Sequence, residues 1–157
     1  RDWARIISSG IVTPTHTLPA WKVGIVDERS EIAGCVRGVP QLQFGSRVDV
    51  LDACPKAEGM MMLIRSMSPD VIVADEIGRS EDTVSVLEAV NAGIKLMITT
   101  HGSSLEEVGK RPTIKYLIDL EVFSRFVILS RGEQSGFSYK VLNAQGKSLF
   151  SERSVRV

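Results

Sequence analysis

The stretch "VIVADEIGR", residues 71–79, runs four apolar residues straight into two acids. An apolar run this short is typical of a β-strand that is buried on both faces. Strands of that kind belong to parallel sheets covered by helices, so the stretch favours an α/β fold. Adjacent carboxylates at the end of a buried strand, here Asp75 and Glu76, also indicate a functional site.

The flanking segments repeat this alternation of helix and strand. Further strands are expected over 22–28, 46–52 and 94–102, and helices over 1–10, 54–70, 80–93, 103–110 and 112–123. Segments 11–21 and 29–45 lack periodicity and are expected to be loops, and Ser80 is the expected N-cap of its helix. Near the C-terminus, 125–132 and 137–150 are expected to be strands, the latter a hairpin turning near 144–147. The pattern predicts a mainly parallel sheet followed by a C-terminal β-hairpin.

The bulk composition describes a globular domain. The chain has 157 residues, of which 43% are hydrophobic and 24% charged, and Lys+Arg and Asp+Glu both count 19. The neutral sum shows no overall basic footprint for nucleic acid. Cys35 and Cys54 stand far apart and form no zinc-type pair. No apolar run approaches the roughly 18 residues of a membrane span.

Polar residues follow three of the expected strands at the point where each strand ends. They are Asp27 and Glu28, Asp75 and Glu76, and Thr100 and His101. Ligands of open α/β sheets bind at the carboxyl ends of the strands. The sequence therefore predicts one site at this edge of the sheet.

Four apolar residues followed by Asp-Glu match the Walker B pattern of ATPases. In that pattern Asp75 would hold magnesium and Glu76 would orient and deprotonate the attacking water. The alternative is structural, because acids also end strands as caps for the following helix.

The partner motif of Walker B, the phosphate loop G-x-x-x-x-G-K-[ST], is absent. The string "QGKS" at 145–148 fails because Val141 stands where the first Gly is required, and it lies in an expected hairpin. The chain thus carries the metal and water side of an ATP site without its phosphate-binding loop.

Three strings resemble the stage III sporulation protein AA family closely: "VGIVDERSEIAGC", "RVDVLDACPKAEGMMMLIRSMSPDVIVADEIGRSED" and "TTHGSSLEEVGKRP". The resemblance runs from residue 1 to about residue 129. It implies an ATPase of the channel between mother cell and forespore, distantly similar to the RecA-like hexameric ATPases of type II and type IV secretion. The implied fold is a RecA-like P-loop NTPase core. In that family the phosphate loop directly precedes a helix like "RDWAR", so 1–157 is expected to be one domain truncated after its first strand and phosphate loop.

The resemblance also implies roles for single residues. Asp27 and Glu28 correspond to an acidic box that helps order the metal-bound water. Thr100 and His101 correspond to a histidine box that senses the γ-phosphate or relays its loss. The alternative for His101 is a capping or buried hydrogen-bonded histidine.

An arginine finger must reach the γ-phosphate of a neighbouring subunit, so it should lie on an exposed, irregular segment. Arg29 and Arg47 fit this requirement best. The other candidates are Arg37, Arg79, Arg111 and Arg125.

The sequence thus predicts an ATP- and Mg²⁺-dependent motor subunit in a secretion-type channel of endospore formation. The resemblance implies a hexameric ring on the cytoplasmic, mother-cell side of the forespore membrane. It also implies contacts with the channel's membrane proteins, without direct membrane insertion and without nucleic acid. Two rival functions are a catalytically silent ring scaffold and a RecA-like nucleic-acid translocase. The retained Glu76 disfavours the first, and neutral charge with 6% aromatic residues disfavours the second.

Overall fold

The computed structural model describes residues 1–131 and 137–154. The chain divides into two compact units, Arg1–Thr100 and His101–Val157, and each is described by itself. That 1–157 forms one domain stays a prediction.

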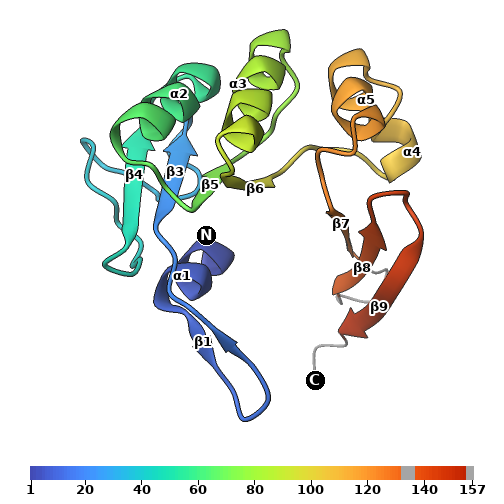
Figure 1. The fold of residues 1–157 in the computed structure, drawn as a ribbon, viewed down its shortest axis with the longest axis horizontal. Coiled ribbons are helices and arrows are strands. Elements are labelled where there is room, and N and C mark those ends of the chain that lie inside the picture. The colour runs from blue at the N-terminus through green and yellow to red at the C-terminus, as the bar shows by residue number, and fades with distance from the viewer. Residues whose placement is uncertain (132–136, 155–157) are drawn as a thin grey trace. The chain divides into compact units, whose positions relative to one another are not determined.

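The first unit is an α/β layer structure (Figure 1). Its elements are α1 (Asp2–Ser9), β1 (Ile11–Val12), β2 (Thr17–Leu18), β3 (Val23–Asp27), β4 (Val48–Asp52), α2 (Lys56–Ser66), β5 (Val71–Ala74), α3 (Ser80–Asn91) and β6 (Lys95–Ile98). The main sheet has the order β4-β3-β5-β6, and all its neighbouring strands are parallel. The expected α/β architecture with a mainly parallel sheet is confirmed.

The prediction of a loop over 11–21 is wrong in part. Strands β1 and β2 form a small antiparallel hairpin, with Ile11 opposite Leu18 and Val12 opposite Thr17. Each strand is only two residues long, which is too short for a periodicity signal. Pro14 lies in the turn between the strands, and Pro19 follows the second strand.

Helices cover both faces of the main sheet (Figure 1). On one face, Ala4 of α1 packs with Val23 and Ile25 of β3 and with Val71 and Val73 of β5. On the other face, α2 lies on β3 and β5, and α3 lies beside α2 and on β6. Burial on both faces explains why β3 and β5 are continuous apolar runs rather than alternating ones.

The start of α3 corrects the predicted cap. Arg79, not Ser80, is the N-cap residue. The carboxylate of Asp82, one turn inside the helix, accepts the backbone N–H of Gly78 at 2.9 Å and of Arg79 at 3.0 Å. An acid at this position binds N–H groups at the entry to the helix, which fixes the start of α3 at Arg79 rather than at Ser80.

The second unit contains α4 (Leu105–Val108), α5 (Pro112–Asp119), β7 (Arg125–Arg131), β8 (Phe137–Asn143) and β9 (Ser148–Ser154). The predicted hairpin of β8 and β9 is confirmed, and β7 joins it to form the antiparallel sheet β7-β8-β9. Gly132, the last residue of the expected 125–132 strand, lies outside the described residues.

Close contact between α2 and β3 depends on Gly59. A β-carbon there would lie 2.6 Å from Cγ1 of Val26, which is fully buried, and 3.3 Å from Sγ of Cys54. We expect Gly59→Ala to destabilise the fold by about 1 kcal/mol, because the cost of overpacking exceeds the gain in helix propensity. Urea denaturation followed by circular dichroism measures this.

Gly78→Ala is the matched control, because nothing lies within 4 Å of the β-carbon it would add. We expect it to change stability by less than about 0.5 kcal/mol. Equal stability of both variants would show that α2 and β3 are not in the close contact described.

Candidate active site at the carboxyl edge of the sheet

The parallel pairing of β3 and β5 fixes where the acids lie. Val23 pairs with Val71 and Val26 with Ala74, so both strands end at the same level. Asp27, the last residue of β3, and Asp75, the first residue after β5, therefore lie side by side. The predicted convergence of acids at the carboxyl edge is what the register produces.

Asp27 is fully buried, and its carboxylate is saturated by backbone donors. Oδ1 accepts the N–H of Glu31 at 2.8 Å, and Oδ2 accepts those of Ile32 at 3.0 Å and Ala33 at 2.8 Å. Three such bonds compensate the burial of the charge. Asp27 thus holds the segment that follows β3 over the end of the sheet, and its predicted cofactor role stays a prediction.

Glu28 lies between two cations. Its Oε2 pairs with Nζ of Lys56, and its Oε1 lies 3.4 Å from Nη1 of Arg79. The hydrogen bond from Lys56 holds the pKa of Glu28 below its ordinary value, and the charges of Lys56, Arg79 and Arg29 act in the same direction. Glu28 is therefore ionised and anchored at the edge.

Asp75 differs from the other acids of this edge. Both of its carboxylate oxygens are buried, and neither has a hydrogen-bond partner among the residues that the structure describes. Burial raises the pKa of Asp75, and the charge of Asp27 raises it further, whereas Lys56, the backbone N–H of Asp75 itself and Arg29 lower it. Two buried carboxylate oxygens without donors fit a hard cation such as Mg²⁺.

The turn after β5 is held by the end of β6. Glu76 has a left-handed backbone, with φ 43°, and its N–H donates to Oγ1 of Thr99 at 3.0 Å. Ile77 donates its N–H to the carbonyl of Thr99 at 3.0 Å, and Oγ1 of Thr100 donates to the carbonyl of Ile77 at 3.3 Å. Since left-handed backbone is uncommon for a residue other than Gly, this bonding explains how Glu76 is kept there.

Arg29 meets Glu76 in the same chain. Its Nη2 pairs with Oε2 of Glu76 and lies 3.4 Å from Oε2 of Glu31. The charges of Glu31 and Glu76 raise the pKa of Arg29. Half of the Arg29 side chain is exposed, so water screens the pair.

Two predicted site residues are not brought to this cluster. The carbonyl of Arg47 accepts the N–H of Val23 at 2.8 Å, which places Arg47 at the amino edge of the sheet, opposite the acids. His101 opens the second unit, so the structure does not place it relative to the first. Their predicted roles stay predictions.

Sequence reasoning missed Lys56 and Thr99. Lys56 lies in the helix expected over 54–70, and only 7% of its side chain is exposed. Thr99 lies directly before the Thr100 that was singled out. A lysine in the first turn of a helix, where the helix dipole disfavours cations, was the available signal for Lys56.

In the part of the chain that the structure describes, no three His, Cys, Asp or Glu side chains are grouped to hold a metal ion.

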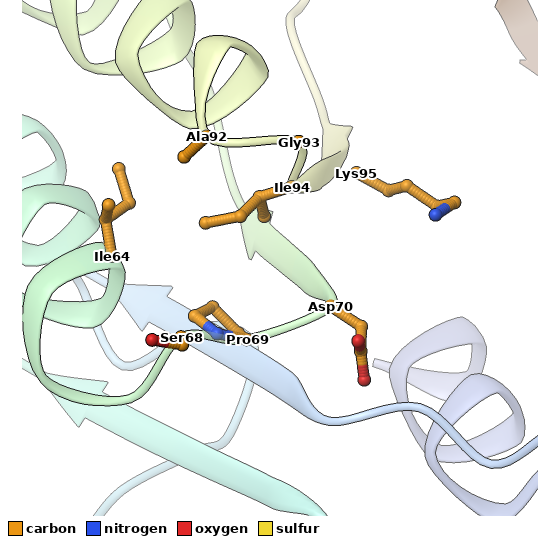
Figure 2. Close-up of a pocket in the computed structure, with 8 residues that line it drawn as sticks. All are labelled: Ile64, Ser68, Pro69, Asp70, Ala92, Gly93, Ile94 and Lys95. Carbon is orange, nitrogen blue, oxygen red and sulfur yellow. The ribbon is translucent and has the colours of Figure 1, made fainter.

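A cavity of about 250 Å³ lies at the other end of the strands (Figure 2). It lies between the ends of α2 and α3 and the starts of β5 and β6, and it is lined by Ile64, 68–70 and 92–95. Asp70 and Lys95 are its charged residues. The cavity is therefore distinct from the cluster of acids at the carboxyl edge.

A family model described as "Sporulation stage III, protein AA" matches residues 1–149. The chain belongs to this family. The stage III sporulation protein AA of Bacillus subtilis (strain 168) is 51% identical over 156 residues, which are 99% of this chain and 50% of that protein. The uncharacterised protein ycf45 of Cyanidium caldarium is 30% identical over 122 residues, covering 75% of this chain and 33% of that protein. The chain spans half or less of the length of these relatives.

The fold is also that of a solved ATPase. The Legionella pneumophila ATPase DotB aligns with a TM-score of 0.55 at 18% identity, over 79% of this chain and 37% of that one. This confirms the predicted fold class of the chain, an α/β fold with a mainly parallel sheet. Among residues 1–131 and 137–154, no helix combines the length and the apolarity needed to cross a membrane.

The missing partners of Asp75 predict a stability effect. A raised pKa means that the folded state holds the proton of Asp75 more tightly than the unfolded state does. Ionisation at neutral pH therefore costs the folded state free energy. Without Mg²⁺, we expect Asp75→Asn to stabilise the chain at pH 7 by about 1 kcal/mol.

The gain should disappear near pH 3, below the ordinary aspartate pKa of about 3.9, where the carboxyl group is protonated in both states. Thermal melts in EDTA across this pH range measure it. Asp49→Asn, on the exposed part of β4, is the control and should leave stability unchanged within about 0.5 kcal/mol. A loss of stability in Asp75→Asn at pH 7 would show that the carboxylate has a partner after all.

Proposed function

We propose that this chain carries the metal-binding and water-activating part of an ATPase that serves a secretion-type channel in endospore formation. The observation that carries the proposal is Asp75, whose buried carboxylate oxygens have no hydrogen-bond partner among the described residues, next to Glu76 at the carboxyl end of a central parallel strand. Membership of the sporulation protein AA family and the fold of an ATPase support it.

In this proposal Asp75 would hold Mg²⁺ at the carboxyl edge. The bound cation would neutralise charge on the β- and γ-phosphates of ATP. Glu76 orients the attacking water and takes its proton at a carboxylate oxygen. Its left-handed backbone, fixed by Thr99, aims the side chain differently from that of Asp75, so the two carboxylates serve different atoms.

The remaining residues of the edge support these two. Asp27 keeps the segment after β3 in place through its backbone bonds, and Glu28 supplies a second anchored carboxylate near the metal. Thr100 ties the turn of Glu76 to β6, so loss of the γ-phosphate can be passed to the segment that begins with His101. Because Arg29 pairs with its own Glu76, this pair must open before Arg29 reaches a neighbouring subunit.

The proposal extends to the assembly. As in the RecA-like secretion ATPases that the sequence resembles, the subunits form a hexameric ring, with Arg29 or Arg47 as the arginine finger. The ring docks on membrane proteins of the channel at the cytoplasmic, mother-cell side of the forespore membrane. The family membership supports this placement, and the Bacillus relative of twice the length leaves room for the phosphate loop elsewhere in the full-length protein.

The chain by itself should bind Mg-ATP weakly, with a dissociation constant of about 1 mM or higher. Backbone amides and the lysine of a phosphate loop supply most of the grip on the β- and γ-phosphates, and this sequence contains no such loop. Isothermal titration calorimetry of residues 1–157 measures the affinity. Micromolar binding would mean that the nucleotide uses a different site.

In the full-length protein, Glu76→Gln should lower ATP turnover by about 10² to 10⁴-fold, because an amide cannot take the proton from water. Binding of Mg-ATP should stay close to wild type. Asp75→Ala should instead weaken Mg-ATP binding, because it removes the metal ligand. Steady-state hydrolysis and nucleotide affinity, measured for both variants, test the two roles.

Glu88→Gln, on the exposed side of α3, is the control and should keep wild-type turnover and affinity. Near-normal turnover of Glu76→Gln, or equal loss of binding in both variants, would mean that the acids only cap the strand.

A further inference from the structure

A buried lysine stands where physical chemistry does not favour one. Lys56 is the first residue of α2, and 7% of its side chain is exposed. The N-terminus of a helix carries partial positive charge, so a cation there is unfavourable. Burial adds a desolvation cost that only a close anion offsets.

Lys56 reaches the acids of the candidate site from the first turn of α2. Its ammonium pairs with Oε2 of Glu28, whose other oxygen faces Arg79. Its charge also acts on Asp75, where it lowers the pKa against the effect of burial. Lys56 thus pairs with one carboxylate, Glu28, and its charge acts on a second, Asp75, whose oxygens have no hydrogen-bond partner among the described residues.

We propose that Lys56 is a positioning residue of this site, which anchors Glu28 and places a positive charge near Asp75 when no divalent cation is bound. The inference rests on the proposed metal role of Asp75. Lys56 balances the buried negative charge in the empty site. When a divalent cation binds Asp75, the ammonium repels the cation and keeps Glu28 from closing on it.

In this arrangement the positive charge of Lys56 lowers the affinity of the site for a cation. Loss of the ammonium removes the repulsion and frees a second carboxylate, Glu28, for the metal. Both effects strengthen cation binding. A lysine that only stabilised the fold would not, on removal, increase the affinity for a metal.

The test uses Mn²⁺ as the probe, on the full-length protein without nucleotide. Electron paramagnetic resonance measures free Mn²⁺, and circular dichroism melts check the fold. We expect Lys56→Met to bind Mn²⁺ about tenfold more tightly than wild type, since it removes a unit positive charge that acts on Asp75, and with it a repulsion of this order. Lys56→Arg keeps the charge and should stay within about threefold of wild type.

Two further variants complete the design. Lys115→Met removes an exposed lysine that pairs with Asp119 on α5, and it should leave Mn²⁺ affinity unchanged. Glu28→Gln removes the carboxylate that pairs with the Lys56 ammonium. The positive charge of Lys56 then acts more strongly on Asp75, so Mn²⁺ affinity should fall severalfold. This second variant decides the matter if Lys56→Met does not fold.

A folded Lys56→Met that binds Mn²⁺ as wild type does, or more weakly, overturns the proposal, as does unchanged affinity in Glu28→Gln. Asp75→Asn separates this failure from that of the proposed function. If it loses Mn²⁺ binding while Lys56→Met is unchanged, the metal role of Asp75 stands and that of Lys56 falls. If Asp75→Asn binds as wild type does, both fall.

Discussion

The in-register parallel pairing of β3 with β5 is the constraint on which the site depends. Val26 lies opposite Ala74, so the residues that follow, Asp27 and Asp75, are forced together at the end of the sheet. A shift of one residue would turn Asp75 to the other face and separate the acids. The buried faces of both strands, covered by α1 on one side and α2 on the other, prevent that shift.

Acids brought so close must be compensated one by one, and the structure does this in three ways. Backbone N–H groups saturate Asp27, two cations hold Glu28, and Arg29 pairs with Glu76. Burial raises the pKa of Asp75, while Lys56, the backbone N–H of Asp75 itself and Arg29 lower it, and its carboxylate oxygens have no hydrogen-bond partner among the other described residues. Three of these four acids have partners, whereas the oxygens of Asp75 have none among the described residues. Such an uncompensated carboxylate destabilises the fold, and groups of this kind are typical of functional sites.

The sequence indicated the layer structure well because strong periodic signals carried it. The apolar runs of β3 and β5 and the acids after β5 can be recognised in the sequence alone. The α3 cap was harder to predict, because the Asp82 carboxylate accepts the N–H groups of Gly78 and Arg79 ahead of the helix, whereas an N-cap Ser80 would accept N–H groups inside it. The hairpin of β1 and β2 was too short to leave a pattern.

The electrostatic partners could not be predicted, for a different reason. Glu28 and Lys56 are 28 positions apart, and nothing in the spacing of either residue points to the other. Asp27 was expected to help order the metal-bound water, which stays a prediction. Its bonds with three backbone N–H groups of the next segment could not be predicted, because a loop conformation of that kind has no periodic signature. Arg47 was predicted to be an arginine finger because its segment is irregular. The register of β4 places it at the amino edge of the sheet, opposite the acids.

The central claim is that the carboxyl edge around Asp75 is the metal and nucleotide site. A crystal structure of the full-length protein with Mg²⁺ and a non-hydrolysable ATP analogue tests it most directly. The account predicts electron density for a Mg²⁺ ion that Asp75 coordinates, directly or through one water, with the γ-phosphate facing Glu76. Nucleotide bound at the amino-edge cavity near Asp70 and Lys95, with Asp75 still without a ligand, would contradict it.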